Sequence, residues 1–432
     1  MSEKLAILGG TPVRSKPFAP RKTMQVEEKS AVNEVMDSDC LSGFFGAPSE
    51  QFLGGAKVRE FEAAWAKKFG YKYAVTTNSW TTGLVTAVGA IGISPGDEVI
   101  TTPYTMSATA TAILFWGGVP VFADIEENTF NLDPASIEAN ITERTKAIMV
   151  VHIFGCPANM SAILDIAKRH KLKVIEDAAQ SPSATIDGKP VGAIGDIGGF
   201  SLNYHKHIHT GEGGVLVTNN EDLAKRSQLL RNHGENVVEA WEVEDLTNMV
   251  GNNYRLTELQ SAIGIEQLKR LDGIVSLRQE MADFLNMRLG KLDCIKISDV
   301  PKNMTHAYYV YALRYDEKTH GVSRETFVEA VNAELPAIIT SDDIPLTNGY
   351  IEPLYMSPLY QKKIAFGANH YPFSLDDCKQ DYKKGLCPTV ERMQEKELML
   401  STIVRDPLNL DDMEHFASAI EKTVRNISQL KK

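Results

Sequence analysis

An acid and a lysine in two dissimilar segments could together hold and activate a heterocyclic cofactor. Asp177 ends the segment 173–177, which predicts a buried strand, and Lys206 lies in a polar, histidine-rich stretch that ends at the glycine cluster 211–214. A buried carboxylate is costly unless a cation accompanies it, and a lysine amine can bond an aldehyde covalently. Pyridoxal phosphate requires a carboxylate at its protonated ring nitrogen and an amine at its aldehyde. The pair therefore predicts a pyridoxal phosphate site with Asp177 and Lys206 as catalytic residues.

Each of the two residues also has a simpler interpretation. An isolated aspartate at a strand end is more often a helix N-cap or part of a structural ion pair, and most loop lysines are solvated. To act on a cofactor, Lys206 would need a pocket that favours its neutral amine. His205, His207 and His209 flank it and are expected to supply positive potential there.

Three further segments offer groups that bind phosphate. Ser201 supplies a hydroxyl, and segment 79–83 opens an expected helix, where free backbone N–H groups attract anions. Segment 251–255 precedes another helix and offers amide and guanidinium donors. Each segment could equally be an ordinary helix cap or turn. In combination they add a hydroxyl and a helix start to the acid and the amine, in an order that a parallel sheet can bring into one crevice.

The elements that would position these residues alternate between strand and helix from residue 58 onward. Short apolar strands separated by helices predict an α/β fold with a mostly parallel sheet covered on both faces. Ligands of such sheets bind at the carboxyl ends of strands, where Thr77, Pro103 and Asp177 fall. Strands are expected at 73–77, 98–102, 120–124, 147–152 and 173–177, and helices at 58–69, 82–91, 107–116, 133–140 and 160–170.

The pattern changes after residue 255 and predicts three parts in the chain. Residues 1–55 are expected to form an N-terminal arm and a helix (27–36), and residues 56–255 the large cofactor-binding domain. Residues 256–432 would form a smaller α+β domain with helices at 256–271, 277–289, 323–332 and 411–430 and a strand at 307–314. The segment 335–390 is rich in Pro, Gly, Tyr and Asp and too long for a plain connector, which predicts a lid or substrate loop.

Composition excludes several classes of protein. The net charge of −11 argues against nucleic acid or an anionic membrane as the main partner. The apolar runs are too short to cross a bilayer, and the N-terminus lacks the core of a signal peptide. The five cysteines are scattered without zinc or redox spacing. These features predict a cytoplasmic protein with free thiols and no metal site.

Several ordered motifs resemble those of one family, the DegT/DnrJ/EryC1/StrS sugar aminotransferases, within fold type I of the pyridoxal phosphate enzymes (aspartate-aminotransferase-like). The resemblance covers roughly residue 5 to the end, and the matching segments are 8–12, 93–99, 176–180, 206–214, 231–234 and 253–255.

This resemblance implies a role for each matching residue. Lys206 would bond the cofactor aldehyde, Asp177 would face the ring nitrogen, and Gln180 would lie near the ring hydroxyl. Asn253 would reach the phosphate from a second subunit, so the active unit would be a homodimer that shares its active sites. The phosphate would be bound within one subunit by Ser201, Thr81 and the backbone of Trp80.

The sequence departs from the family pattern at a few positions. Trp80 stands where the family usually has glycine, and Met106 where it has the aromatic residue that stacks on the ring. A sulfur atom can also pack on a ring, so Met106 is kept as a cofactor-binding residue. Pro182 stands where the family usually has His or Leu after the glutamine of its motif, which is Gln180 here. Segment 349–355 resembles the branch with the scyllo-inosose aminotransferases, which also includes nucleotide-sugar enzymes.

The resulting prediction is a pyridoxal phosphate-dependent aminotransferase of polysaccharide biosynthesis. Glutamate or glutamine would give its amino group to a keto group of a nucleotide-linked sugar. One alternative is a ketocyclitol aminotransferase of the scyllo-inosose type. Another is a keto-sugar dehydratase, although such relatives carry His where this chain has Lys206. A non-catalytic sugar sensor would have no need of Asp177 and Lys206.

Overall fold

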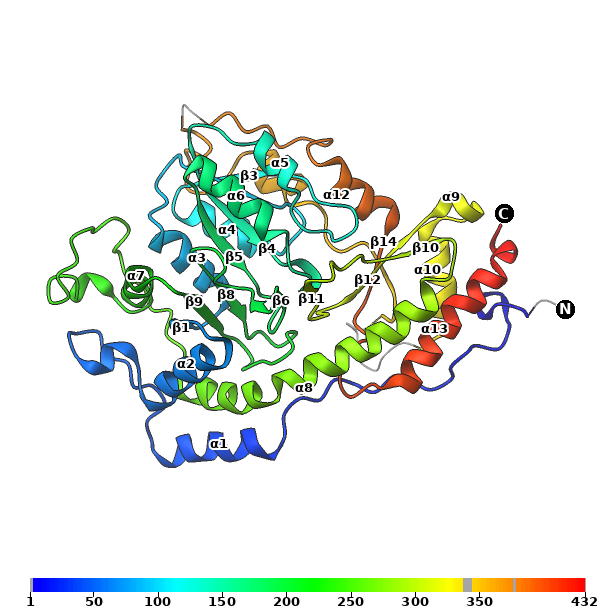
Figure 1. The fold of residues 1–432 in the computed structure, drawn as a ribbon, viewed down its shortest axis with the longest axis horizontal. Helices are drawn as coiled ribbons and strands as arrows, with labels where there is room; N and C mark the ends of the chain where they lie inside the picture. Colours follow the sequence, from blue (N-terminus) through cyan, green and yellow to red (C-terminus); the bar gives the residue numbers. More distant parts are fainter. Residues whose placement is uncertain (1–2, 337–343, 376–377, 432) are drawn as a thin grey trace.

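The computed structural model describes residues 3–336, 344–375 and 378–431, and a seven-stranded sheet lies at the centre of its larger part (Figure 1). The strand order is β1-β9-β8-β5-β4-β2-β3. All strands run in one direction except β9, which pairs antiparallel with both β1 and β8. This confirms the expected mostly parallel sheet. The strands are β1 (Tyr73–Thr77), β2 (Glu98–Thr101), β3 (Val119–Phe122), β4 (Thr145–Val151), β5 (Lys173–Asp177), β8 (Ile197–Ser201) and β9 (Gly214–Thr218).

Two apolar cores cover the two faces of this sheet, because successive strand side chains point to opposite faces. Val174 of β5 belongs to one core and its neighbour Ile175 to the other. The Val174 core includes α2 (Ala56–Phe69), α5 (Pro134–Ala139) and α6 (Met160–His170). The Ile175 core includes α3 (Trp80–Ala90), α4 (Ala108–Phe115) and α7 (Glu221–Arg231).

Sequence reasoning missed the β8–β9 pair and α7. Strand β8 reads Ile-Gly-Gly-Phe-Ser, and adjacent glycines weaken the propensity and the pattern that identify a strand. The glycines are there because other atoms approach closely: a Cβ on Gly198 would lie 2.7 Å from the Cβ of Glu176 on β5. Close packing between β5 and β8 thus sets the composition of the strand that ends at Ser201.

One continuous helix, α8 (Glu258–Leu289), covers the expected helix 256–271 and its expected continuation 277–289 without a break between them. Its first half packs into the core of the large sheet through Ile265, Leu268 and Leu271. Its second half packs into a separate core through Leu285 and Leu289. The helix continues through Asp272 and Gly273 because both of its ends are held by tertiary packing.

The second core covers a four-stranded antiparallel sheet in the C-terminal part of the chain. Its order is β10 (Ile295–Ile297), β12 (Tyr311–Tyr315), β14 (Leu398–Ser401) and β13 (Thr347–Asn348). Helices α10 (Arg324–Ala333) and α13 (Leu410–Arg425) pack there beside α8. The expected strand 307–314 begins later, at Tyr311, because Tyr308 has a left-handed backbone with φ of 49°.

The described part of segment 335–390 packs against the large sheet. Tyr355, Tyr360, Phe373 and Tyr382 form an aromatic cluster around Phe122 of β3. The Tyr382 hydroxyl and the backbone N–H of residue 354 donate to backbone carbonyls at the start of β3 and after β2. Residues 337–343 and 376–377 lie outside the described residues. The described part of the segment is therefore packed in place, and its expected role as a lid or substrate loop stays a prediction.

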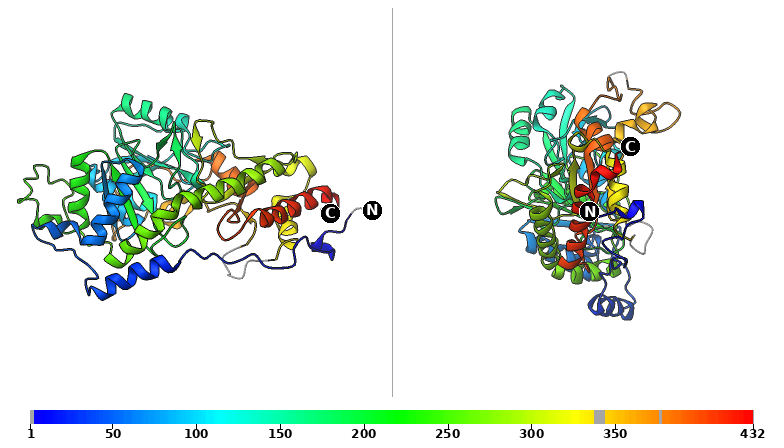
Figure 2. Two further views of the ribbon diagram at one scale, coloured as in Figure 1. Left: turned by 60° about the horizontal axis from the view of Figure 1, so that its bottom comes forward. Right: turned by 90° about the vertical axis from the view of Figure 1, so that its right-hand side faces the viewer.

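The N-terminal arm runs along the C-terminal core to α1 (Val26–Asp37), which lies against α8 (Figure 2). Arg14 pairs with Asp412 of α13 at 3.0 Å, and the N–H of Ala6 donates to Glu334 at 2.8 Å. The arm thus contacts the smaller core before it reaches the larger one. The expected division of the chain at residues 55 and 255 stays a prediction. Among the described residues, the helices are all too short or too polar to span a bilayer.

Candidate active site

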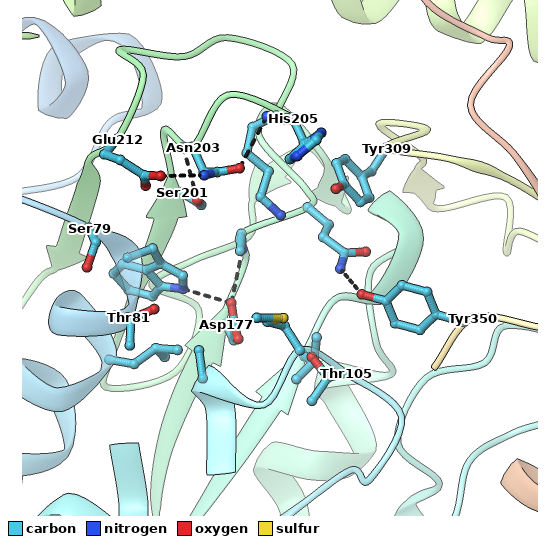
Figure 3. A pocket seen from close by; sticks show the side chains of 18 residues that line it. Ser79, Thr81, Thr105, Asp177, Ser201, Asn203, His205, Glu212, Tyr309 and Tyr350 are labelled. Atoms are coloured by element: carbon cyan, nitrogen blue, oxygen red, sulfur yellow. Dashed lines mark hydrogen bonds between the residues drawn. The ribbon is translucent and has the colours of Figure 1, made fainter. Parts of the chain in front are cut away.

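A cavity of about 450 Å³ lies at the carboxyl ends of β1, β5 and β8 (Figure 3). Parallel strands place their carboxyl ends at one edge of a sheet, so segments far apart in sequence meet there. Every predicted site residue except Asn253 contributes to the lining: Trp80, Thr81, Met106, Asp177, Gln180, Ser201 and Lys206. The acid and the lysine therefore face one cavity, as the sequence predicts.

Asp177 ends β5 and is only 5% exposed. Three donors hold its carboxylate: the Trp80 indole N–H at 2.8 Å and the Ala179 N–H at 3.2 Å reach Oδ1, and the Thr109 hydroxyl reaches Oδ2 at 2.8 Å. None of these donors carries a positive charge. A buried anion without a cation is expensive, and a protonated ring nitrogen in the cavity would supply the missing cation.

Lys206 lies in a loop between β8 and β9 that is held through its backbone. Its N–H donates to the Asn203 carbonyl at 2.9 Å, and the Arg21 guanidinium of the N-terminal arm donates to the carbonyls of Tyr204 and Lys206. The side chain is half-buried, with its Nζ 4.3 Å from the centroid of the Tyr309 ring. The loop therefore keeps its shape without the lysine side chain.

Two of the three flanking histidines, His207 and His209, do not supply the expected positive potential. Burial and the nearby Arg278 lower the pKa of His207 far below its usual value, and burial with Arg21 lowers the pKa of His209 to about 4. Both rings are therefore neutral near pH 7, and His205 is exposed. Arg21 and Arg278 bring positive charge to the loop, and sequence reasoning missed both because they lie far away in the chain.

The start of α3 and the end of β8 form a polar corner of the cavity. The Ser79 side chain caps the helix by accepting the Thr82 N–H at 3.1 Å. The first N–H groups of a helix lack partners within the helix, which leaves those of Trp80 and Thr81 for a ligand. The Thr81 and Ser201 side chains line the same cavity. This donor set fits a phosphate, and with Asp177 and Lys206 it fits pyridoxal phosphate.

Aromatic residues from distant segments close the side of the cavity beside Gln180. Its Oε1 accepts the Phe154 N–H at 2.7 Å, and its Nε2 donates to the Tyr350 hydroxyl at 3.3 Å. Phe154 has a left-handed backbone with φ of 59°, which is strained for a bulky residue. Its carbonyl accepts the Tyr309 N–H, and its ring packs edge-on against Tyr350. Tyr309 and Tyr350 were not predicted as site residues, although Tyr350 belongs to the segment 335–390 that was expected to be a lid or substrate loop.

Two predicted residues lie at or beyond the rim. Met106 lines the cavity but is 63% exposed. Asn253 is exposed and outside the lining, and its carbonyl accepts the Asn78 side chain at 3.4 Å. The roles that the resemblance gives to Met106 and Asn253 stay predictions.

We expect a pH-dependent stability from His306, beneath the segment that carries Tyr309. Burial lowers the pKa of His306 to about 3, and its Nδ1 accepts the Tyr308 N–H at 2.8 Å. An unfolded histidine titrates near about 6.5, so the unfolded chain takes up this proton first as the pH falls. The neutral ring of His306 therefore makes its full contribution to the free energy of unfolding above about pH 6.5, and this contribution declines as the pH falls towards 3.

The substitution His306→Asn tests this expectation, because its Oδ1 can accept the same N–H but does not titrate. Between pH 7 and pH 5 the variant should lose about 2 kcal/mol less unfolding free energy than wild type, as measured by urea denaturation. His370→Asn, at an exposed histidine, is the control. Parallel pH dependences of wild type and His306→Asn would contradict the assignment.

The sequence matches the model of the DegT/DnrJ/EryC1/StrS aminotransferase family over residues 25–399. The spore coat polysaccharide biosynthesis protein SpsC of Bacillus subtilis is 36% identical over 375 residues, which cover 84% of this chain and 90% of that protein. GDP-perosamine synthase of Caulobacter vibrioides is 39% identical over 300 residues (69% and 76%). The L-glutamine:2-deoxy-scyllo-inosose aminotransferase of Streptomyces lividus is 32% identical and matches over 100% of both chains.

Solved structures share the fold. The aminotransferase from Psychrobacter cryohalolentis superposes with a TM-score of 0.79 at 28% identity, covering 95% of this chain and 100% of that one. DesI, solved with its TDP-sugar product, superposes with a TM-score of 0.78 at 26% identity and 98% coverage of both chains.

Proposed function

The chain belongs to the DegT/DnrJ/EryC1/StrS aminotransferase family, and from this premise we propose that it transfers an amino group from glutamate or glutamine to a keto group of a nucleotide-linked sugar. It is an aminotransferase with the type I fold of the pyridoxal phosphate enzymes. The proposed cofactor is pyridoxal phosphate, with Lys206 as the residue that bonds it.

The observation that carries the proposal is the meeting of Asp177 and Lys206 in one cavity at the strand ends. A buried carboxylate whose donors among the described residues are all neutral suits a protonated ring nitrogen, and a half-buried lysine whose loop is held by backbone contacts suits an aldehyde. In this proposal, the Ser201 and Thr81 hydroxyls and the Trp80 N–H bind the phosphate.

The proposed chemistry needs one group that moves a proton. Pyridoxal phosphate, when bound, supplies a ring that accepts the electron pair left on the substrate carbon. Lys206 Nζ removes the proton from the amine-bearing carbon of the donor; the donor nitrogen would remain on the cofactor, and water would supply the carbonyl oxygen of the keto acid that leaves. With the keto sugar, Nζ delivers a proton to the carbon that receives this nitrogen. The Tyr309 ring, 4.3 Å from Nζ, stabilises the protonated lysine between these steps.

Relatives of two kinds bear on the acceptor. GDP-perosamine synthase and the DesI complex with a TDP-sugar support a nucleotide-linked sugar. The scyllo-inosose aminotransferase matches along the whole chain, and Tyr350 of the segment that resembles that branch lines the cavity. A ketocyclitol acceptor is therefore the second candidate. His207 is buried and donates to the Ala307 carbonyl, so it does not replace Lys206 as a dehydratase would require.

We also propose that the active unit is a homodimer. Met106, which lines the cavity, and Tyr204, two residues before Lys206, are 63% and 52% exposed, and a partner subunit would cover such side chains. Asn253 lies outside the lining in its own subunit, in keeping with a role in the partner's site.

A substrate panel tests the proposed function. Purified protein with pyridoxal phosphate should show a visible absorption band that glutamate or glutamine removes and that one keto acceptor restores. The panel contains UDP-, dTDP- and GDP-linked keto sugars and scyllo-inosose, with product formation followed by mass spectrometry. Restoration by scyllo-inosose alone would select the ketocyclitol activity. Colourless protein that pyridoxal phosphate leaves unchanged would contradict the proposal.

A further inference from the structure

We propose that the indole of Trp80 is a positioning residue that fixes the rotation of the Asp177 carboxylate. The inference rests on the proposed function and deepens it. The resemblance gives Trp80 a role only through its backbone, at the phosphate, whereas the new role belongs to its side chain, at the opposite end of the proposed cofactor.

The hydrogen bonds around Asp177 leave one acceptor position for a ligand. A carboxylate oxygen has two lone pairs. The Trp80 indole and the Ala179 N–H occupy both lone pairs of Oδ1, at 2.8 and 3.2 Å. The Thr109 hydroxyl occupies one lone pair of Oδ2, at 2.8 Å. The remaining lone pair of Oδ2 is the position left for the ring nitrogen, and the carboxylate cannot turn without breaking the bond to the indole.

Two glycines make room for the indole. A Cβ on Gly83 of α3 would lie 2.4 Å from Trp80 Cε3, and a Cβ on Gly199 of β8 would lie 2.5 Å from Trp80 Cη2 and 2.2 Å from the Val215 carbonyl oxygen of β9. Glycine inside a helix or a strand is destabilising, yet Gly83 is kept where the indole approaches, and Gly199 is kept where both the indole and the β9 backbone approach. The space is retained for an indole that is 5% exposed and hydrogen-bonded. The site is therefore shaped around this side chain.

A second buried tryptophan shows that packing alone does not require such a bond. Trp65 is fully buried in the core on the opposite face of the sheet, and among the described residues its indole N–H has no hydrogen-bond partner. The Trp80 N–H instead points at a carboxylate, and hydrogen bonds to charged groups are roughly twice as strong as neutral ones. Trp80 therefore does more than fill space.

The substitution Trp80→Phe keeps an aromatic ring and removes only the donor and one ring. We expect about 10- to 100-fold weaker binding of pyridoxal phosphate, which is the usual effect of one hydrogen bond to a charged group. The pH midpoint of the visible absorption band of the bound cofactor should also shift. Trp65→Phe, a matched change in the other core, should leave both quantities unchanged.

A double-mutant cycle with Asp177→Asn separates positioning from packing. If Trp80 acts through Asp177, Trp80→Phe should weaken binding in the wild type but add little in the Asp177→Asn protein. An equal fold-change in both backgrounds, or the same loss in Trp65→Phe, would overturn the inference. Wild-type protein that does not bind pyridoxal phosphate would instead overturn the proposed function.

The hydrogen bond itself can be tested in the protein without cofactor. The chain has four tryptophans, so the indole resonance of Trp80 in a ¹⁵N spectrum is assigned by its loss in Trp80→Phe. This resonance should move in Asp177→Asn, while that of Trp65 stays in place. An unmoved Trp80 resonance would overturn the inference even if the variants bind the cofactor poorly for other reasons.

Discussion

Replacing Lys206 by alanine is expected to abolish amino transfer, with kcat lowered by at least about 10³-fold, while the protein stays folded. The loss is large because Nζ both bonds the proposed cofactor and moves the proton between carbons. The fold should survive because the loop is held by backbone contacts from Arg21 and Asn203. The side chain itself contributes a cation–π contact with Tyr309, which at a half-exposed site is worth about 1 kcal/mol or less.

Two measurements check this expectation. Borohydride reduction followed by peptide mass spectrometry should attach the cofactor to the peptide containing Lys206 in the wild type and to no peptide in Lys206→Ala. Lys189→Ala, at an exposed lysine, should retain the label and wild-type turnover. Appreciable turnover by Lys206→Ala, or a label on another lysine, would refute the mechanism.

The substitution Asp177→Asn should lower kcat by about 10²- to 10³-fold, the usual effect of removing one preorganised electrostatic contact. The Trp80 indole and the Ala179 N–H both donate to Oδ1, so the amide oxygen of the variant must take that place. Its NH₂ group then faces Thr109 and the cavity. A donor in that position cannot accept a hydrogen bond from a protonated ring nitrogen, so the ring would lose its proton and its electron-withdrawing strength.

This outcome differs from the loss of Lys206 in a measurable way. Asp177→Asn should still be labelled at Lys206 after borohydride reduction, and the donor half-reaction should slow in stopped-flow absorbance. Asp165→Asn, on an exposed turn of α6, is the control and should behave as the wild type. Unchanged half-reaction rates in Asp177→Asn would mean that the carboxylate does not face the cofactor ring.

Most strands of the large sheet could be predicted from the sequence, because a buried strand appears there as a short apolar segment bounded by helices. Segments such as 145–151 and 173–177 are apolar and bounded by helices, and both lie within one or two residues of their expected positions. Strand β8 escaped detection because its glycines are selected by contact with β5 and with the Trp80 indole, which no local pattern records. The continuous α8 was likewise decided by packing into two cores.

For the candidate site, too, some features could be predicted from the sequence and others depend on the tertiary structure. The sequence by itself determined the chemical inventory, an acid at a strand end, a lysine, a hydroxyl and a helix start, because parallel strands must bring their carboxyl ends together. Only the tertiary structure decided how these groups are used. Folding placed Tyr309, Tyr350 and Arg21 beside residues that are far away in the sequence. Burial lowered the pKa of His207 and of His209, which keeps both rings neutral near pH 7. Folding also turned the Trp80 indole towards Asp177, because hydrogen-bond direction and desolvation depend on neighbours in space, which a linear pattern of residues does not contain.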